Sequence, residues 1–231
     1  MKIPLSPRLR ACCNFIAPGD RVADVGTDHG YLGIWLLSQG IARSVIASDI
    51  VPGPLSAAKR NAEKYAVTDR MEFCLSDGVC SIPRDFDVLV CAGMGADTIV
   101  SILCAAPWLK STHYRLVLQC QSKTYLLRRY LSEQGWRITE ESVLRDGRFL
   151  YTVMEVYWEP KYPKLTPGEW YFPGALLENP SAEVPAYYRW VTEGLQIATA
   201  HQDIPEKTQA LEYLLSLAQT PELSWLKEET P

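Results

Sequence analysis

The sequence lacks the features that mark a membrane protein, a metalloprotein or a strongly basic nucleic-acid binder. It has no apolar run of membrane length and no uninterrupted apolar leader near its N-terminus, so we expect no membrane partner and a cytoplasmic location. Its 23 Lys and Arg residues against 27 Asp and Glu give a net charge of −4, so no global basic field indicates nucleic acid. A nucleic-acid partner would have to be met by a local patch.

The cysteine pattern disfavours a disulfide scaffold and contains no metal motif. The seven cysteines are odd in number, lie mostly in apolar runs and show no C-x-x-C spacing, so we interpret them as reduced core residues and expect no metal. No internal repeat or low-complexity tract interrupts the chain. Its 231 residues, 47% of them hydrophobic, suffice for one domain of ordinary size and a smaller one, and we expect a monomer.

What the sequence does contain is a candidate nucleotide-binding stretch, Val22-Ala23-Asp24-Val25-Gly26-Thr27-Asp28-His29-Gly30-Tyr31-Leu32. A β-branched run, two glycines and an apolar segment predict a strand, a tight loop and a helix start, where bare backbone and unpaired N–H groups receive a ligand. The dinucleotide fingerprint is absent, because Asp28 stands where G-x-G-x-x-G needs a glycine. Asp24 suits an ammonium group, which S-adenosylmethionine has and NAD lacks. The alternative is a strand-turn-helix without a ligand.

Acidic residues end three successive predicted strands, at Asp24, Asp49 and Asp77. The carboxyl ends of parallel strands share one edge of a sheet, and ligands bind in the crevice there. Asp49 follows Asp24 at about the spacing at which an acid meets a ribose hydroxyl pair. Each acid taken alone is equally consistent with a helix N-cap or a turn.

A second glycine motif, Gly93-Met94-Gly95, closes the buried-looking run 86–92. Two glycines allow the backbone to approach a flat ring, with Met94 packing on its face. The alternative is that Met94 only fills core.

The pattern of apolar runs predicts an α/β fold. Strands are expected at 21–25, 44–48, 71–75, 86–92, 115–119, 137–144 and 149–157, with helical patterns after the first, second, fourth and fifth. The turn Asp146-Gly147 joins the last two strands directly, so one strand of the sheet must be reversed. This is the Rossmann-like layout of class I methyltransferases, a seven-stranded, mostly parallel sheet.

The chain changes in composition near residue 160, so we expect a catalytic domain at 1–160 and a linker with a C-terminal α-helical domain at 161–231. After a proline-rich stretch, the seam residues of two successive segments recur at steps of four and three positions. Asp203-Ile204-Pro205 separates the two segments. They predict an antiparallel helical hairpin with a coiled-coil-like seam. Such a hairpin either packs on itself or forms an arm that holds a large substrate. The seam residues are Val184, Tyr188, Val191, Leu195 and Ala198, then Ile204, Thr208, Leu211, Leu215 and Ala218.

Taken together, these motifs resemble the bacterial tRNA (adenine(22)-N1)-methyltransferase family over most of the first 155 residues. The chain departs from the family at Gly93-Met94-Gly95-Ala96, where G-M-G-G is usual, and at Leu118-Gln119-Cys120-Gln121, where L-Q-P-N is usual. The second departure lies at the expected acceptor edge, so it bears on the substrate more than on the cofactor. The resemblance is carried by Leu5-Ser6-Pro7-Arg8-Leu9, residues 23–32, Asp49, Gly53-Pro54-Leu55, Asp77-Gly78, Ala92-Gly93-Met94-Gly95 and 115–119.

The resemblance implies S-adenosylmethionine as cofactor, with S-adenosylhomocysteine as product. Asp24 would take the methionine ammonium, Asp49 the ribose and Asp77 the adenine amine, while the backbone from Gly26 to Gly30 would wrap the cofactor. The implied cofactor-binding residues are Asp24, Gly26, Thr27, His29, Gly30, Tyr31, Leu32, Asp49, Ile50, Asp77, Gly78, Gly93, Met94 and Gly95.

The implied reaction, methylation of adenine N1 at position 22 in the D-arm of tRNA, needs little from the protein beyond alignment. N1 has an in-plane lone pair, so no general base is needed, but the base must be unpaired or swung out of its stack. The absence of an N-P-P-Y motif after the fourth strand fits a ring nitrogen rather than an exocyclic amine. Asp28 is the candidate for stabilising the cationic product. His29 is a second candidate catalytic residue, with loop ordering as its alternative.

Local cations are the candidates for tRNA contacts: Arg8, Arg10, Lys123, Arg128 and Arg129. The alternative for each is an ordinary solvated helix face. Two other functions stay open, a methyltransferase of the same fold acting on a small molecule or protein, and a catalytically silent RNA-binding module. The first would bind the cofactor without preferring tRNA, and the second would not bind the cofactor.

Overall fold

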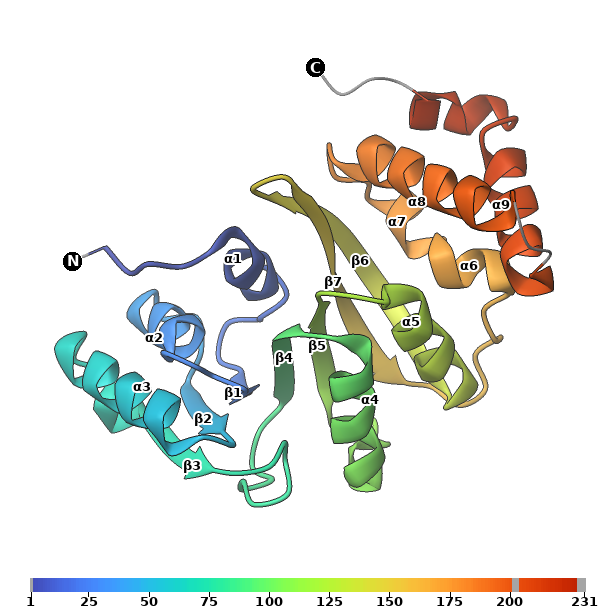
Figure 1. Cartoon of the computed structure of the whole chain (residues 1–231). Coiled ribbons are helices and arrows are strands. Elements are labelled where there is room, and N and C mark those ends of the chain that lie inside the picture. The colour runs from blue at the N-terminus through green and yellow to red at the C-terminus, as the bar shows by residue number, and fades with distance from the viewer. Residues whose placement is uncertain (1, 201–203, 228–231) are drawn as a thin grey trace.

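The computed structural model describes residues 2–200 and 204–227, and a seven-stranded sheet forms their centre (Figure 1). The strands lie in the order β3-β2-β1-β4-β5-β7-β6. Neighbouring strands from β3 to β5 pair in parallel, whereas β7 is antiparallel to both β5 and β6. The predicted fold class is therefore confirmed, including the one reversed strand. The strands are β1 (Arg21–Val25), β2 (Ser44–Asp49), β3 (Met71–Leu75), β4 (Val88–Met94), β5 (Arg115–Cys120), β6 (Trp136–Asp146) and β7 (Phe149–Trp158).

Helices cover both faces of this sheet, as the continuous burial of its central strands requires. The core of one face packs under α1, α2 and α3, and the core of the other face packs under α4 and α5. These helices are α1 (Pro7–Cys13), α2 (Tyr31–Ser38), α3 (Pro52–Lys64), α4 (Ala96–Ala105) and α5 (Thr124–Glu133). Short 3₁₀ turns lie at η1 (Thr68–Arg70) and η2 (Pro107–Leu109).

Local sequence signals fix several element ends. The Ser6 hydroxyl accepts a hydrogen bond from the Leu9 N–H at 3.3 Å, and Pro7 occupies the first turn, so these two residues define the start of α1. The predicted turn between the last two strands shifts by one residue. Asp146 still pairs with Phe149, and the turn falls on Gly147 and Arg148, with Gly147 at a φ of 61°.

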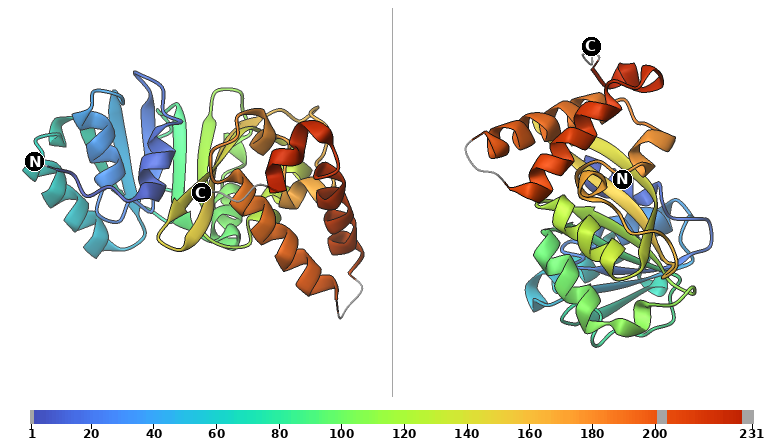
Figure 2. Two further views of the ribbon diagram at one scale, coloured as in Figure 1. Left: turned by 90° about the horizontal axis from the view of Figure 1, so that it is seen from above. Right: turned by 90° about the vertical axis from the view of Figure 1, so that its right-hand side faces the viewer.

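The C-terminal helices form a separate layer at the β6 end of the sheet (Figures 1 and 2). Their apolar core includes Val143 of β6, so the helices pack on the sheet as well as on one another. They are α6 (Pro167–Tyr171), α7 (Ala175–Glu178), α8 (Val184–Thr199) and α9 (Pro205–Leu217), followed by the 3₁₀ segment η3 (Pro221–Lys227).

The hairpin of α8 and α9 keeps the predicted seam on α8 and part of it on α9. On α8 the seam positions from Val184 to Leu195 are buried. On α9 the predicted Ala218 is buried and Leu211 packs against the core, but Leu215 is 42% exposed, and Ala210 and Leu214 are buried instead. The reason is that α9 packs against α6 as well as α8, which rotates its buried stripe. Asp203, in the predicted connection, lies outside the described residues.

Within the part of the chain that the structure describes, no helix combines the length and apolar character needed to span a membrane.

Candidate active site

The site begins at Asp24, the penultimate residue of β1. Its side chain is only 4% exposed, and the Thr27 hydroxyl donates a hydrogen bond to it at 2.7 Å. Burial raises the pKa of the Asp24 carboxyl to about 6, the bond from Thr27 opposes this rise, and the charge of Asp49 adds to it. A buried carboxylate with one hydroxyl partner has remaining acceptor capacity, and a cation at this position would stabilise it.

The loop after β1 is held by backbone hydrogen bonds and by one close contact. The N–H groups of Gly26 and Thr27 both donate to the Ser48 carbonyl at 2.9 Å, which ties this loop to β2. Gly26 has a φ of 71°, and a Cβ placed on it would lie 2.3 Å from the Met94 Cε. The backbone conformation therefore favours glycine here, and a side chain at this position would displace the flexible end of Met94.

Asp49, at the end of β2, connects two loops. One of its carboxylate oxygens accepts from the Asp28 N–H at 3.2 Å, and the other accepts from the Val51 N–H at 3.0 Å. A carboxylate has about four lone-pair sites, so Asp49 keeps acceptor capacity for ligand hydroxyls. Its position at the tip of β2, one strand from Asp24, follows from the parallel register in which Asp24 pairs with Ala47.

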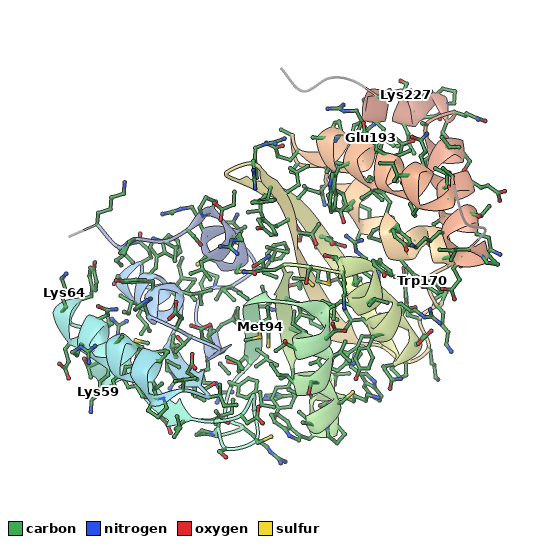
Figure 3. The ribbon with its side chains drawn as sticks, in the orientation of Figure 1. Lys59, Lys64, Met94, Trp170, Glu193 and Lys227 are labelled. Carbon is green, nitrogen blue, oxygen red and sulfur yellow. The ribbon has the colours of Figure 1, made fainter. Side chains whose placement is uncertain are left out.

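Two cavities open on either side of Gly26, which lines both. The β3-side cavity has a volume of about 220 Å³. The β5-side cavity has a volume of about 350 Å³. Figure 3 shows Met94, which lines the β3-side cavity, near the middle of the molecule at the end of β4. Predicted site residues divide between the cavities, with Asp49, Ile50, Asp77, Gly78 and Met94 on the β3 side and Asp24, Thr27, Asp28, Leu32 and Gly93 on the β5 side.

The acids that end the first three strands thus share one edge of the sheet, as the sequence predicts. Strands β1, β2 and β3 run parallel and adjacent, so their carboxyl ends meet there. Among the described residues, no group of three or more His, Cys, Asp or Glu is arranged to hold a metal ion. The arrangement suits an organic ligand with a cationic end and a hydroxylated, ring-bearing end.

Four predicted site residues, His29, Gly30, Tyr31 and Gly95, line neither cavity. The His29 ring lies 5.8 Å from the Tyr31 ring, and its Nε2 is 3.5 Å from an Asp28 carboxylate oxygen. The His29 carbonyl accepts from the Asn61 side chain at 2.9 Å, and Gly30, with a φ of 72°, caps α2. These contacts order the loop, and a ligand contact for these residues stays a prediction.

The predicted RNA-binding cations fall into different environments. Arg8 lines the β5-side cavity, where its Nε donates to Asp146 at 2.8 Å. Arg10 lies over the Trp35 ring at 5.4 Å and is exposed. Lys123 donates to Asp97 at 2.8 Å.

Arg129 lies over the Trp170 ring at 4.6 Å and pairs with Glu133 and Glu206. Its guanidinium is therefore held at the junction of α5, α6 and α9. An RNA phosphate would have to compete with these two carboxylates for the Arg129 guanidinium.

The prediction that Arg128 contacts RNA is wrong, because its side chain is completely buried. Its guanidinium donates to Glu141 at 2.7 Å and to the Tyr187 hydroxyl at 3.1 Å. It also donates to the carbonyls of Trp170 and Tyr171. Arg128 is thus a structural residue that joins α5, β6, α6 and α8.

Sequence reasoning placed two glutamines at the acceptor edge, near the end of β5, but assigned them no role. The side chain of Gln119 is fully buried, and its carbonyl oxygen accepts from the Gly93 N–H at 3.0 Å, which positions the glycine motif. Gln121 lines the β5-side cavity, and its backbone N–H donates to the Met94 carbonyl at 2.8 Å. The available signal was a polar residue following a buried strand, the same signal that singled out the three acids.

Comparison with known proteins agrees with this geometry. Residues 5–154 match a family model described as "Methyltransferase domain". The tRNA (adenine(22)-N(1))-methyltransferase of Bacillus subtilis is 30% identical over 154 residues, which cover 66% of this chain and 65% of that protein. This sequence match therefore spans just under two thirds of the relative's length.

Similarity to solved structures extends further along the chain. A Streptococcus pneumoniae protein, provisionally named a tRNA (m1A22) methyltransferase and solved with S-adenosyl-L-methionine, is 26% identical with a TM-score of 0.80. The superposition covers 92% of this chain and 98% of that one. The Bacillus subtilis M1A22 tRNA methyltransferase, 24% identical with a TM-score of 0.76, covers 98% of both chains and shows the shared fold.

Proposed function

The chain belongs to the methyltransferase-domain family, and on that premise we propose that it transfers the methyl group of S-adenosylmethionine to N1 of adenine 22 in the D-arm of tRNA. The observation that carries the proposal is the convergence of Asp24, Asp49 and Asp77 around Gly26 at one edge of the sheet. The relatives named above support the substrate and the cofactor.

The residues present fit the cofactor. The buried Asp24 carboxylate, whose pKa is raised to about 6, suits the ammonium of the methionine end. The β3-side cavity offers Asp49 for the ribose hydroxyls and Asp77 for the adenine amine, with Met94 against the ring. When bound, S-adenosylmethionine supplies an electrophilic methyl group on a sulfonium.

The protein's part in catalysis is alignment rather than proton removal. Adenine N1 presents its own lone pair. An adenine ring positioned in the β5-side cavity can therefore attack the methyl group without a residue that removes a proton from it. Gly93 is fixed there by Gln119, and Arg8 and Gln121 line the same space. Asp28, which lines the cavity, stabilises the positive charge that develops on the methylated base.

We also propose that residues 1–160 form the methyltransferase domain and residues 161–231 the linker and helical domain. The end of β7 at Trp158 and the separate apolar core of α6 to α9 support this boundary. A cytoplasmic location follows from the proposed substrate. The monomeric state stays a prediction, which light scattering measures.

The experiment that tests this function uses unmodified tRNA, labelled S-adenosylmethionine and mapping of the methylated base. We expect label at N1 of adenine 22 and none in a control tRNA with guanine at that position. Label elsewhere in tRNA would keep the reaction class and overturn the target. Cofactor binding without RNA methylation would favour a small-molecule or protein substrate, and RNA binding without cofactor binding would favour a silent RNA-binding module.

A further inference from the structure

A third cavity, which the proposed reaction does not use, lies between the carboxyl end of β5 and the C-terminal helices. We call it the α8-side cavity, because six of its lining residues come from α8. Its volume is about 360 Å³, within the range of roughly 300 to 1,000 Å³ typical of small-molecule sites. It brings residues of the two predicted domains together around one space.

Aromatic rings form much of the cavity wall. Tyr125 and Tyr171 stack with their ring centroids 4.7 Å apart and their planes at 7°. Trp190 of α8 lies 5.7 Å from the Tyr187 ring and is 60% exposed, so much of its indole is not covered by protein. Aromatic rings of this kind are the surfaces on which proteins stack unpaired bases.

The charge of the lining favours an anionic occupant. Lys123, Arg128 and Lys207 line the cavity, and no Asp or Glu of the described residues does. The carboxylates that pair with Lys123 and Arg128, Asp97 and Glu141, lie outside the lining. These two cations are largely neutralised by their carboxylates, so Lys207, for which the described structure shows no carboxylate partner, supplies the positive charge that a phosphate would meet.

One polar group in the wall lacks a partner. Thr152 of β7 lines the cavity and is 1% exposed, and its hydroxyl has no hydrogen-bond partner in the described structure. Buried hydroxyls are normally paired, so this group is a candidate contact for the donors and acceptors of a base.

The α8-side cavity also lies beside the proposed site of methyl transfer. Gln121 lines both this cavity and the β5-side cavity. The guanidinium of Arg8, in the β5-side cavity, lies 5.1 Å from the centre of the Tyr151 ring, which lines the α8-side cavity. A polymer with one unit in the β5-side cavity therefore has a neighbouring unit within reach of the second.

We propose that the α8-side cavity binds a second unpaired nucleotide of the RNA whose target adenine enters the β5-side cavity. Its base stacks on Trp190, and its phosphate faces Lys207. This inference rests on the proposed function and deepens it, because it assigns the C-terminal helices a direct part in holding the substrate.

The test compares Trp190→Ala with Trp190→Phe, which keeps an aromatic ring. Ile197→Ala is the matched control, because Ile197 is on the same helix, is 73% exposed and does not line the cavity. We expect Trp190→Ala to lose about fivefold to 100-fold in tRNA affinity, the range for removal of one base–aromatic stack. Trp190→Phe should lose less and Ile197→Ala nothing, while all three keep wild-type affinity for S-adenosylmethionine.

Two further measurements use the same proteins. Lys207→Gln should weaken tRNA binding and reduce its salt dependence. Tryptophan fluorescence of the wild type should fall on addition of tRNA by more than that of Trp190→Phe, because a stacked base quenches the indole.

Wild-type tRNA affinity and equal quenching in the Trp190 variants would overturn the proposal for this cavity alone. An unmutated enzyme that binds tRNA through Trp190 but leaves adenine 22 unmethylated would contradict the proposed target and keep the cavity. Absence of any tRNA binding by the wild type would overturn both.

Discussion

At the scale of single residues, the burial of the Asp24 carboxylate in the binding site lowers the stability of the folded protein. Its carboxyl group is buried at the tip of β1 with one hydroxyl partner, and its pKa is raised to about 6. The folded state therefore binds a proton at Asp24 more tightly than the unfolded chain does. Stability from this group is present below the unfolded pKa and is lost as the pH rises through about 6.

Replacing the charge should consequently stabilise the empty protein. We expect Asp24→Asn to raise the free energy of unfolding at pH 7.5 by up to about 3 kcal/mol, from the size of the pKa difference. Below about pH 4, where Asp24 is protonated in both states, the gain should vanish. Urea unfolding at both pH values measures it, and equal stability of the two proteins at pH 7.5 would contradict the argument.

A comparison of Gly26 with Gly147 distinguishes the cost of an unfavourable backbone conformation from the cost of side-chain crowding. Both have positive φ, of 71° and 61°, but only Gly26 has a side chain, that of Met94, against its missing Cβ. Gly26→Ala should therefore lose somewhat more than Gly147→Ala, by up to about 1 kcal/mol, because the flexible end of Met94 must move, whereas Gly147→Ala reports the cost of the conformation alone. Thermal unfolding of the two variants measures this difference. Equal losses would mean that Met94 moves aside without cost.

At the scale of elements, a buried ion pair connects the sheet to the C-terminal helices. The helix α5 looks basic in sequence, and nothing local distinguishes Arg128 from Arg129. Their difference arises from distant partners, because Arg128 lies on the face with Leu127 and Leu131 and meets Glu141 of β6. A one-residue rotation of a helix decides which arginine is buried, and that rotation is set by tertiary packing.

Breaking this pair should be costly. Arg128→Met leaves the Glu141 carboxylate buried without a cation and should lower the free energy of unfolding by about 3 to 5 kcal/mol. Arg129→Met, one residue along the same helix and partly exposed, should lose about 1 kcal/mol or less. Urea unfolding compares them, with the double variant Arg128→Met/Glu141→Met expected to recover most of the loss. A small effect of Arg128→Met alone would contradict the structural role.

The sequence predicts the identity of elements better than their contacts. All seven strands lie within two residues of their predicted bounds. The parallel strands β1, β2, β4 and β5 were the most readily predicted, since buried parallel strands have a continuous apolar signal. The seam on α9 was predicted in part, with Leu215 on the wrong side, because a pattern read from one helix does not reveal that α6 and α8 both pack on it. The three acids at strand ends were predictable, since parallel topology alone brings them to one edge. Gln119 and Gln121 were not, because their roles depend on contacts with β4.

At the scale of the whole molecule, a net charge of −4 means that RNA must be held by local patches. One such patch is on α1, where Arg8 lines the β5-side cavity and Arg10 is exposed. A second is the lining of the α8-side cavity. Together they lie on either side of Gln121, along the carboxyl end of β5.

Neutralising Arg8 and Arg10 should weaken tRNA binding and make it less dependent on salt. The slope of log affinity against log salt concentration should become shallower by roughly 0.7 to 0.9 for each phosphate that the protein no longer neutralises. A matched control is Lys59→Gln/Lys64→Gln, which removes the same charge from α3, away from the β5 end of the sheet (Figure 3). Filter binding over a salt series gives both slopes. Equal slopes for the two double variants would remove Arg8 and Arg10 from the RNA-binding surface.

The most direct test is calorimetric titration of the protein with S-adenosylmethionine as a function of pH. If the buried Asp24 carboxylate receives the ammonium, binding should fit one site per chain and weaken about tenfold per pH unit below 6, where Asp24 is protonated. It should weaken again above about pH 8, where the α-amino group of the free cofactor loses its proton. The Asp24→Asn variant should bind at least about 100-fold more weakly, in line with an unpaired buried charge on the ligand. Absence of heat with the wild type, or an affinity that neither acid pH nor Asp24→Asn reduces, would contradict the assignment of this sheet edge as the cofactor site.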